Sequence, residues 1–382
     1  MIYADYNATT PLSDGAKAWM IKSQELWGNP SSSHRYGRKA LELLNNAREQ
    51  VASMLAVNPN DVVFTSGGSE ANTMALLGTA LDFGPGFKLL TSKVEHSSIR
   101  DTLPLITKMG GTVKFLSVDP NGQINLNELR EMLADFKPHL VSLMTANNET
   151  GVVFPVPQVL DLCEEHSSML HTDAVQGLGK LDPSFYRGAH LVSISAHKIY
   201  GPKGVGALVI RKGTKLTSTH YGGSQEIKRR GGTENVIGIA GFGGAVEEFM
   251  RLERPSDLKS IRDHFESLMG RGMDGISIQG VKEPRIPNTS NIRFHGIASE
   301  VILGALDLDG IFVSAGSACS SGSISPSHVL LAMGLSEQAA RECVRFSWGR
   351  STNLNSVEEV AQTVIAHVAR IRARNELKSS SH

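Results

Sequence analysis

The 382-residue sequence contains little cysteine: three residues, Cys163, Cys319 and Cys343, with no CxxC spacing. An odd number of widely separated cysteines excludes a disulfide framework and a zinc cluster held by thiolates, and it is typical of a reducing compartment such as the cytoplasm. The 13 histidines form no HExxH pattern and no close ligand pair. The sequence therefore predicts no metal site.

The sequence also has no net charge, since Lys and Arg total 38 and Asp and Glu total 38. No overall basic field favours nucleic acid or a membrane surface. The segment MIYADYNATT lacks the basic start and apolar stretch of a secretory signal, and no apolar run is long enough to cross a bilayer. We therefore expect a cytoplasmic protein with no membrane and no direct nucleic-acid partner.

Short apolar segments do recur in the first two thirds of the chain, separated by helical or glycine-rich stretches. They lie at residues 61–68, 88–92, 112–118, 140–146, 169–174, 191–196 and 206–212. Several carry adjacent apolar residues, as strands buried on both faces do. Helices are expected at 69–81 and at 125–136, where Asn125 and Glu128 resemble a capping box. Strands alternating with helices predict a mostly parallel sheet covered on both sides.

A different pattern follows a break near residues 252–256. Helices are expected near 257–270, 299–308, 326–333, 337–344 and 356–373, with short strands at 289–294 and 311–315. Ser325 and Pro326 are suitable residues for the N-cap and first position of one of these helices. This mixture predicts a smaller α+β domain, in agreement with a chain long enough for two domains.

Unusual polar residues follow the predicted strands of the first domain. They form the segments GGSEAN (67–72), VEHSS (94–98), NNETG (147–151), DAVQ (173–176) and SAHK (195–198). Because ligands bind outside the carboxyl ends of strands in open α/β sheets, these segments predict one shared binding site.

Three of these features have a simple structural alternative when each is taken alone. The glycines and Ser69 at a helix start can bind a phosphate, or Ser69 can be an ordinary N-cap. Lys198 at a strand end can form a Schiff base, or it can be a surface lysine. Asp173 can hold a pyridinium nitrogen protonated, or it can cap a helix. The combination of all three indicates one cofactor, pyridoxal 5′-phosphate.

Cys319 lies in the segment SAGSACSSGS (314–323), where few neighbours could bury a thiol. We therefore expect it in an exposed loop. Cys163 and Cys343 lie in segments that read as helical and partly apolar, which favours inert packing in the core.

The motifs DYNATT, GNPSSSH, FTSGGSEAN, VEHSS, NNETG, HTDAVQ, SAHKIYGPKGVGAL, RGGTEN, GSACSSG and RFSWGR follow one another between residue 3 and about residue 350. In this order they resemble the cysteine desulfurases of the NifS/IscS type, within the class V group of fold-type I pyridoxal-phosphate enzymes. The resemblance implies an α/β fold whose large domain has a mostly parallel seven-stranded sheet, plus a smaller α+β domain. It places the large domain at residues 15–255, and the small domain at residues 1–14 and 256–382.

The resemblance also implies a role for each site residue. Lys198 would bind the cofactor and act as a base, His96 would lie over its ring and shuttle a proton, and Asp173 would pair with its pyridine nitrogen. The remaining cofactor contacts would come from Gly68, Ser69, Asn148, Gln176, Ser195 and His197, and from Thr233 of the other subunit of a homodimer. Arg345 and Asn148 would bind the substrate carboxylate.

The implied reaction converts L-cysteine to L-alanine, holds the sulfur as a persulfide on Cys319 and passes it to an acceptor protein. An iron–sulfur scaffold and a thiolation relay both remain open as acceptors. Three alternatives are a selenocysteine lyase, a class V aminotransferase, which would need no thiol in this segment, and a sulfur carrier that binds partners without turnover. The carrier would need none of the chemistry of Lys198, Asp173, His96 and Arg345.

Overall fold

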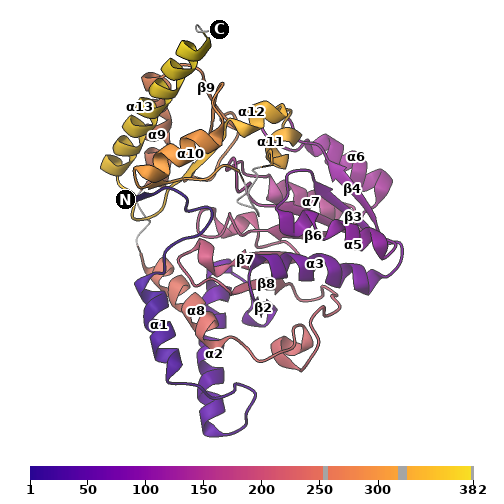
Figure 1. Cartoon of the computed structure of the whole chain (residues 1–382). Coiled ribbons are helices and arrows are strands. Elements are labelled where there is room, and N and C mark those ends of the chain that lie inside the picture. The colour runs from indigo at the N-terminus through magenta and orange to yellow at the C-terminus, as the bar shows by residue number, and fades with distance from the viewer. Residues whose placement is uncertain (253–256, 317–324, 380–382) are drawn as a thin grey trace.

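The computed structural model describes residues 1–252, 257–316 and 325–379 (Figure 1). Its main sheet has seven strands in the order β2-β8-β7-β6-β5-β3-β4. β8 is antiparallel to both of its neighbours, and the other neighbouring pairs are parallel. The strands are β2 (Val62–Thr65), β3 (Lys88–Ser92), β4 (Thr112–Leu116), β5 (Leu140–Met144), β6 (Met169–Asp173), β7 (Leu191–Ser195) and β8 (Gly206–Ile210). The mostly parallel sheet expected from the sequence is confirmed.

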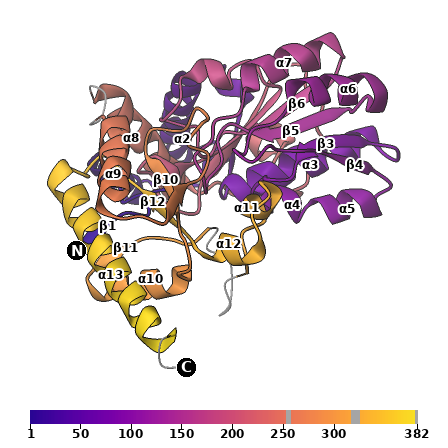
Figure 2. The same cartoon turned by 90° about the horizontal axis from the view of Figure 1, so that it is seen from above.

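Burial explains why these segments form strands. Every residue of β2, β5, β7 and β8 is buried, whereas most of β4, at the edge of the sheet, is exposed or half-buried. Helices cover both faces, with α6 and α7 on one side of the sheet and α3, α4 and α5 on the other (Figure 2). Such strands need apolar residues on both faces, which is the pattern that the sequence shows.

The helices of this part of the chain have well-defined bounds. They are α1 (Asp14–Gln24), α2 (Arg35–Leu55), α3 (Gly68–Phe83), α4 (Ser97–Arg100), α5 (Leu103–Lys108), α6 (Leu126–Phe136), α7 (Val156–Glu165) and α8 (Val236–Arg251), with short 3₁₀ helices at Pro59–Asp61, Pro183–Phe185, Ala196–Lys198 and Gln225–Lys228. Asn125 is the N-cap of α6, as predicted. Glu128 does not complete the expected capping box, because its Oε1 accepts a hydrogen bond from Ser117 N at 3.2 Å.

The C-terminal third has its own hydrophobic cluster, built around Phe265, Phe346 and Trp348. Its sheets are β12-β10-β9, which is antiparallel, and the parallel pair β1-β11. The elements are β1 (Ile2–Tyr3), α9 (Leu258–Gly272), β9 (Ile276–Ile278), β10 (Thr289–Phe294), α10 (Ser299–Leu308), β11 (Ile311–Phe312), α11 (His328–Ala332), α12 (Glu337–Arg341), β12 (Cys343–Ser347) and α13 (Leu354–Ser379). Ala4 packs into the same cluster, which supports assigning the first residues to the small domain. The boundaries near residues 14 and 255 stay a prediction, and residues 253–256 lie outside the described part.

Two local predictions are wrong in this region. The N-cap of α11 is Ser327, whose side chain accepts from Leu330 N, so the helix begins two residues later than Pro326 suggested. Residues 343 and 344 belong to β12 rather than to a helix, since their backbone pairs with β10. Cys343 is therefore a buried strand residue.

Candidate active site

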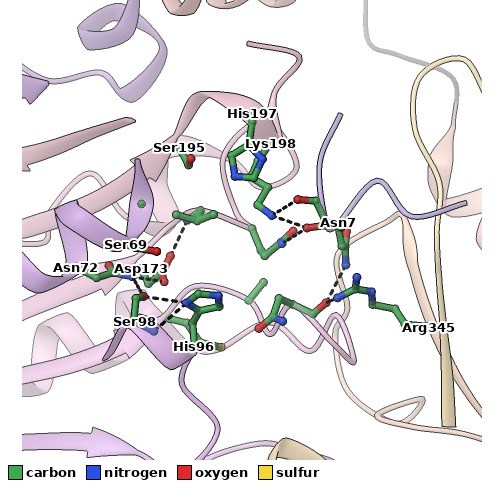
Figure 3. Close-up of a pocket in the computed structure, with 17 residues that line it drawn as sticks. Asn7, Ser69, Asn72, His96, Ser98, Asp173, Ser195, His197, Lys198 and Arg345 are labelled. Atoms are coloured by element: carbon green, nitrogen blue, oxygen red, sulfur yellow. Dashed lines mark hydrogen bonds between the residues drawn. The ribbon is translucent and has the colours of Figure 1, made fainter. Parts of the chain in front are cut away.

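A cavity of about 370 Å³ opens at the carboxyl edge of the main sheet (Figure 3). The turns that follow β2, β3, β5, β6 and β7 all reach it, and β12 of the small domain contributes one residue. Its lining consists of Asn7, Ala8, Gly68, Ser69, Asn72, His96, Ser98, Met144, Ala146, Asn148, Asp173, Val175, Gln176, Ser195, His197, Lys198 and Arg345. The polar segments that follow the strands thus meet at one place.

Asp173 is the last residue of β6 and is 6% exposed. Its Oδ2 accepts a hydrogen bond from Asn72 Nδ2 at 2.7 Å, and its Oδ1 accepts from Val175 N at 2.9 Å. Hydrogen bonds to both oxygens fix the direction of the carboxylate. A carboxylate held in this way at the floor of a cavity suits a protonated ring nitrogen.

Lys198 ends the 3₁₀ turn that follows β7, and its side chain points into the cavity (Figure 3). Nζ donates to the backbone oxygens of Asn7 and Ala8, at 2.6 and 2.8 Å. Burial, together with the positive charge of Arg345, lowers the pKa of Lys198 to about 8. The uncharged amine, which is the nucleophilic form, is therefore more populated near neutral pH than it is for an ordinary lysine.

His96 is the N-cap of α4 on the other side of the cavity. Its Nδ1 accepts from Ser98 N at 3.1 Å and lies 2.8 Å from Ser98 Oγ. Because Nδ1 accepts a backbone hydrogen bond, the neutral ring carries its proton on Nε2. Burial lowers the pKa of His96, which favours this neutral form.

The start of α3 supplies an anion site beside these residues. Gly67, the N-cap, offers no side-chain oxygen to the first backbone N–H groups, and both Gly68 and Ser69 line the cavity. A Cβ on Gly68 would lie 2.7 Å from Val175 Cγ2, so this position has no room for a side chain. Free N–H groups at the start of a 16-residue helix, next to a hydroxyl, fit a phosphate.

Arg345 enters the cavity from β12 and is 2% exposed. Its Nη1 donates to Asn148 O at 3.0 Å, and its Nη2 donates to Asp5 Oδ1 at 2.7 Å. Its buried Nε has no hydrogen-bond partner within the described part of the chain. An unpaired N–H on a guanidinium held in place by two partners suits an incoming carboxylate.

Ten of the twelve predicted site residues line this cavity; their roles stay predictions. They are Gly68, Ser69, His96, Asn148, Asp173, Gln176, Ser195, His197, Lys198 and Arg345. Thr233 is exposed and is not among the lining residues, and Cys319 lies outside the described residues. The predicted set omits Asn7, Asn72 and Ser98. Asn72 lies one helical turn after Ser69, and Ser98 lies two residues after His96. Both belong to the motifs quoted above, so their spacing from these predicted site residues could have identified them.

Across residues 1–252, 257–316 and 325–379, no group of three or more His, Cys, Asp or Glu side chains could hold a metal ion. None of the described helices combines the length and apolar character needed to cross a membrane.

The residues that line the cavity fit pyridoxal phosphate. The amine of Lys198 fits its reactive carbon, the fixed carboxylate of Asp173 fits its ring nitrogen, and the open start of α3 fits its phosphate.

Comparison with known proteins agrees with this geometry. The family model for class-V aminotransferases matches residues 2–360. The cysteine desulfurase IscS of Dictyoglomus turgidum is 39% identical over 372 residues, which cover 95% of this chain and 94% of the relative. The solved NifS-like protein of Rickettsia africae superposes with a TM-score of 0.87 at 30% identity, over 96% of this chain and 99% of that one. A structure described as SspA in complex with cysteine superposes with a TM-score of 0.81 at 32% identity, over 92% of this chain and 100% of that one.

These matches span nearly the whole chain, and the sequence identity is above the level at which only the fold is shared. The fold and the cofactor-binding character expected from the sequence are confirmed. The chain therefore belongs to the cysteine desulfurases of the class-V aminotransferase family, which are pyridoxal-phosphate enzymes.

Proposed function

We propose that this protein takes sulfur from L-cysteine, releases L-alanine, holds the sulfur as a persulfide on Cys319 and passes it to an acceptor protein in the cytoplasm. The observation that carries the proposal is the convergence of Lys198, Asp173, His96 and Arg345 on one cavity of about 370 Å³. A binding protein without turnover needs none of these groups in this arrangement. A cavity of this volume suits a small cofactor with an amino acid beside it.

The cofactor would be held by residues from both ends of the cavity. Lys198 would bind its reactive carbon, Asp173 its ring nitrogen, and the start of α3 with Ser195 and His197 its phosphate. His197 is suited to a neutral contact, because burial and the nearby Lys198 lower its pKa to about 4. When bound, pyridoxal phosphate withdraws electrons from the substrate Cα and so makes its proton acidic.

Arg345 would bind the substrate carboxylate through Nη–H groups that its contacts with Asn148 and Asp5 leave free. Its contact with Asn148 O keeps the guanidinium turned toward the cavity. Lys198 would then take the Cα proton, because its lowered pKa lets it act as a base near neutral pH. His96, with its proton on Nε2, would exchange a proton with the substrate thiol.

The sulfur transfer balances without an external oxidant. The Cys319 thiolate attacks the substrate sulfur, an S–S bond forms, and the substrate Cβ–S bond breaks. The electron pair of that bond stays with carbon, which takes up a proton and leaves as alanine. Both sulfur atoms are oxidised to the persulfide level and the substrate Cβ is reduced to a methyl group, so cysteine and the enzyme thiol give alanine and an enzyme persulfide.

A homodimer is part of the proposal, because Thr233 is predicted to bind the cofactor of the partner subunit. Its exposed position outside the cavity of its own chain supports this role. An iron–sulfur scaffold and a thiolation relay are both suitable sulfur acceptors, and ³⁵S transfer from the loaded enzyme to each candidate distinguishes them.

The test of the proposed function measures alanine and sulfide from L-cysteine with a thiol reductant. The wild-type protein and Cys163→Ala should both form alanine. Cys319→Ala should bind pyridoxal phosphate and change its absorbance with L-cysteine, yet form no alanine and no persulfide. Lys198→Ala should leave the cofactor unattached after borohydride treatment. Full turnover by either Cys319→Ala or Lys198→Ala would contradict the proposal.

A further inference from the structure

Gln176 lines the cavity, and its side-chain amide forms hydrogen bonds with two other residues, Lys180 and Asn7. Its side chain is 5% exposed. Its Oε1 accepts a hydrogen bond from Lys180 Nζ at 2.8 Å, and its Nε2 donates to Asn7 O at 3.0 Å. Lys198 Nζ donates to the same Asn7 oxygen, so Lys180, Gln176, Asn7 and Lys198 form one connected chain of hydrogen bonds.

The chemistry of the two partners determines which way the Gln176 amide faces. A backbone carbonyl only accepts hydrogen bonds, so the Asn7 oxygen fixes the orientation of the amide whatever the protonation state of Lys180. Oε1 must therefore face Lys180, and Nε2 must face Asn7. One N–H of Nε2 is then used by Asn7, and the other is left to donate to an acceptor in the cavity.

The backbone between these residues brings Lys180 back toward Gln176. The segment between β6 and the 3₁₀ helix at Pro183–Phe185 turns tightly, and Gly179 has a positive φ of 72°. A β-carbon is disfavoured there, which explains why glycine precedes the lysine. Lys180 does not line the main cavity; it lines a second, smaller one of about 30 Å³ behind Lys198. It can therefore act on a bound group only through other residues.

We propose that Lys180 is a positioning residue that fixes the Gln176 amide so that its N–H faces the ring oxygen of the bound cofactor. The inference rests on the proposed function, because it assumes that pyridoxal phosphate occupies the cavity. It assigns a role to a lysine that does not touch the reacting atoms. It also predicts that the cofactor oxygen near Gln176 is an acceptor, as an anionic oxygen is.

The charge around Lys180 supports a role next to an anion. Within the described part of the chain Lys180 forms no ion pair, and its one hydrogen bond goes to the neutral Gln176. Burial and the positive charges of Lys198 and Arg345 lower its pKa to about 7. Asp5 pairs with Arg345, but neither Lys180 nor Lys198 forms an ion pair among the described residues, and two such cations favour a negatively charged ligand nearby.

A double-mutant cycle on cofactor binding tests the proposal. Lys180→Met, Gln176→Leu and the double variant are each titrated with pyridoxal phosphate, and the dissociation constant and absorbance maximum are measured. Lys180→Met alone should weaken binding by about five- to tenfold and shift the absorbance maximum, as the loss of one buried hydrogen bond does. In the Gln176→Leu background, Lys180→Met should change either quantity by less than about twofold or not at all, because non-additivity marks residues that act through each other.

Two further variants separate positioning from general effects. Lys180→Arg keeps a donor and should restore the wild-type absorbance maximum. Lys108→Met removes an exposed lysine at the end of α5, away from the cavity lining, and should change neither quantity. Thermal unfolding of each cofactor-free protein reports any loss of folding separately.

The outcomes distinguish this inference from the proposed function. If the wild-type protein binds no pyridoxal phosphate, the proposed function fails. If it binds the cofactor but the effects of Lys180→Met and Gln176→Leu are fully additive, only the role of Lys180 is overturned. An unchanged dissociation constant and spectrum in Lys180→Met would overturn it equally.

Discussion

Arg345 Nη2 lies 2.7 Å from Asp5 Oδ1, and the two residues are 340 positions apart in the sequence. The second oxygen of Asp5 accepts a hydrogen bond from Ser314 Oγ at 2.9 Å. One carboxylate thus connects Arg345 with Ser314, which lies beside it in a β-bridge. It also compensates the charge of a guanidinium that is almost completely buried.

The first prediction concerns this ion pair. Asp5→Asn keeps the shape of the side chain but removes the charge that compensates Arg345. Stability should fall by about 2 kcal/mol, because a buried cation loses its charged partner. The KM for L-cysteine should rise by about tenfold, with a smaller change in kcat, since the guanidinium is less firmly held. Denaturant unfolding and steady-state alanine formation measure the two effects, and an unchanged KM would contradict this role for Asp5.

The second prediction concerns Asp173. Asp173→Asn retains a hydrogen-bonding side chain but cannot stabilise a protonated ring nitrogen by charge. The exchange of the substrate Cα proton with solvent deuterium should slow by about 100-fold or more, and the absorbance of the bound cofactor should shift. Asp82→Asn, at an exposed position at the end of α3, is the matched control and should keep the proton exchange rate and the cofactor absorbance of the wild type. Equal exchange rates in both variants would count against Asp173.

The third prediction is a pH dependence of the Lys198 amine. Its pKa is lowered to about 8, mainly by burial, so the uncharged form accumulates as the pH rises through 8. In the cofactor-free protein, reductive methylation of Lys198 should therefore rise with a midpoint near pH 8. Peptide mass spectrometry after a short reaction measures how far each lysine has been methylated. Asp5→Asn should move the Lys198 midpoint to lower pH, because the Asp5 charge raises this pKa.

The fourth prediction compares the three thiols. Cys163 and Cys343 are 0% and 2% exposed, and burial raises the pKa of each to about 12. Both should react slowly with iodoacetamide at pH 8, because the thiolate is the reactive form. Cys319 is expected to react first, and activity should fall in proportion to its modification. Labelling of Cys163 or Cys343 ahead of Cys319 in the folded protein would refute this order.

The fifth prediction concerns the shared site of the proposed homodimer. Lys198→Ala and Thr233→Glu should each be inactive alone, the second because a negative charge would face the cofactor phosphate. A hybrid dimer contains one intact site if Thr233 acts across the interface. Random reassociation of equal amounts should therefore restore about a quarter of the wild-type activity. No recovery from hybrids verified by mass spectrometry would place Thr233 in the site of its own chain.

Much of the architecture could be predicted from the sequence, because buried strands and their polar ends leave a local signature. β3 and β10 occupy the residues expected from their apolar segments. The residues after each strand meet at one edge, as parallel strands require. Local pattern was less informative where tertiary pairing decides the structure: residues 343 and 344 have helical neighbours, yet they pair with β10.

The contacts of Asn7 and Asp5 could not be derived in the same way. Both are placed by β1 pairing with β11 and by the bridge between Asp5 and Ser347, which are non-local contacts: Asn7 lines the cavity, and Asp5 pairs with Arg345. No local spacing in the sequence reveals that Asn7 O accepts from Lys198 and Gln176. Lys180 is another such case, since only the turn at Gly179 places it against Gln176.

The pairing of Asp5 with Arg345 has a consequence for biosynthesis. The two residues leave the ribosome 340 residues apart, an interval of about 20 to 70 s at typical rates of synthesis. During most of that time β11, Ser347 and the guanidinium of Arg345 do not yet exist, so Asp5 lacks both the partners that place it and the cation that neutralises it. The side of the cavity lined by Asn7, Ala8 and Arg345 is therefore completed last, after all strands of the main sheet have been synthesised.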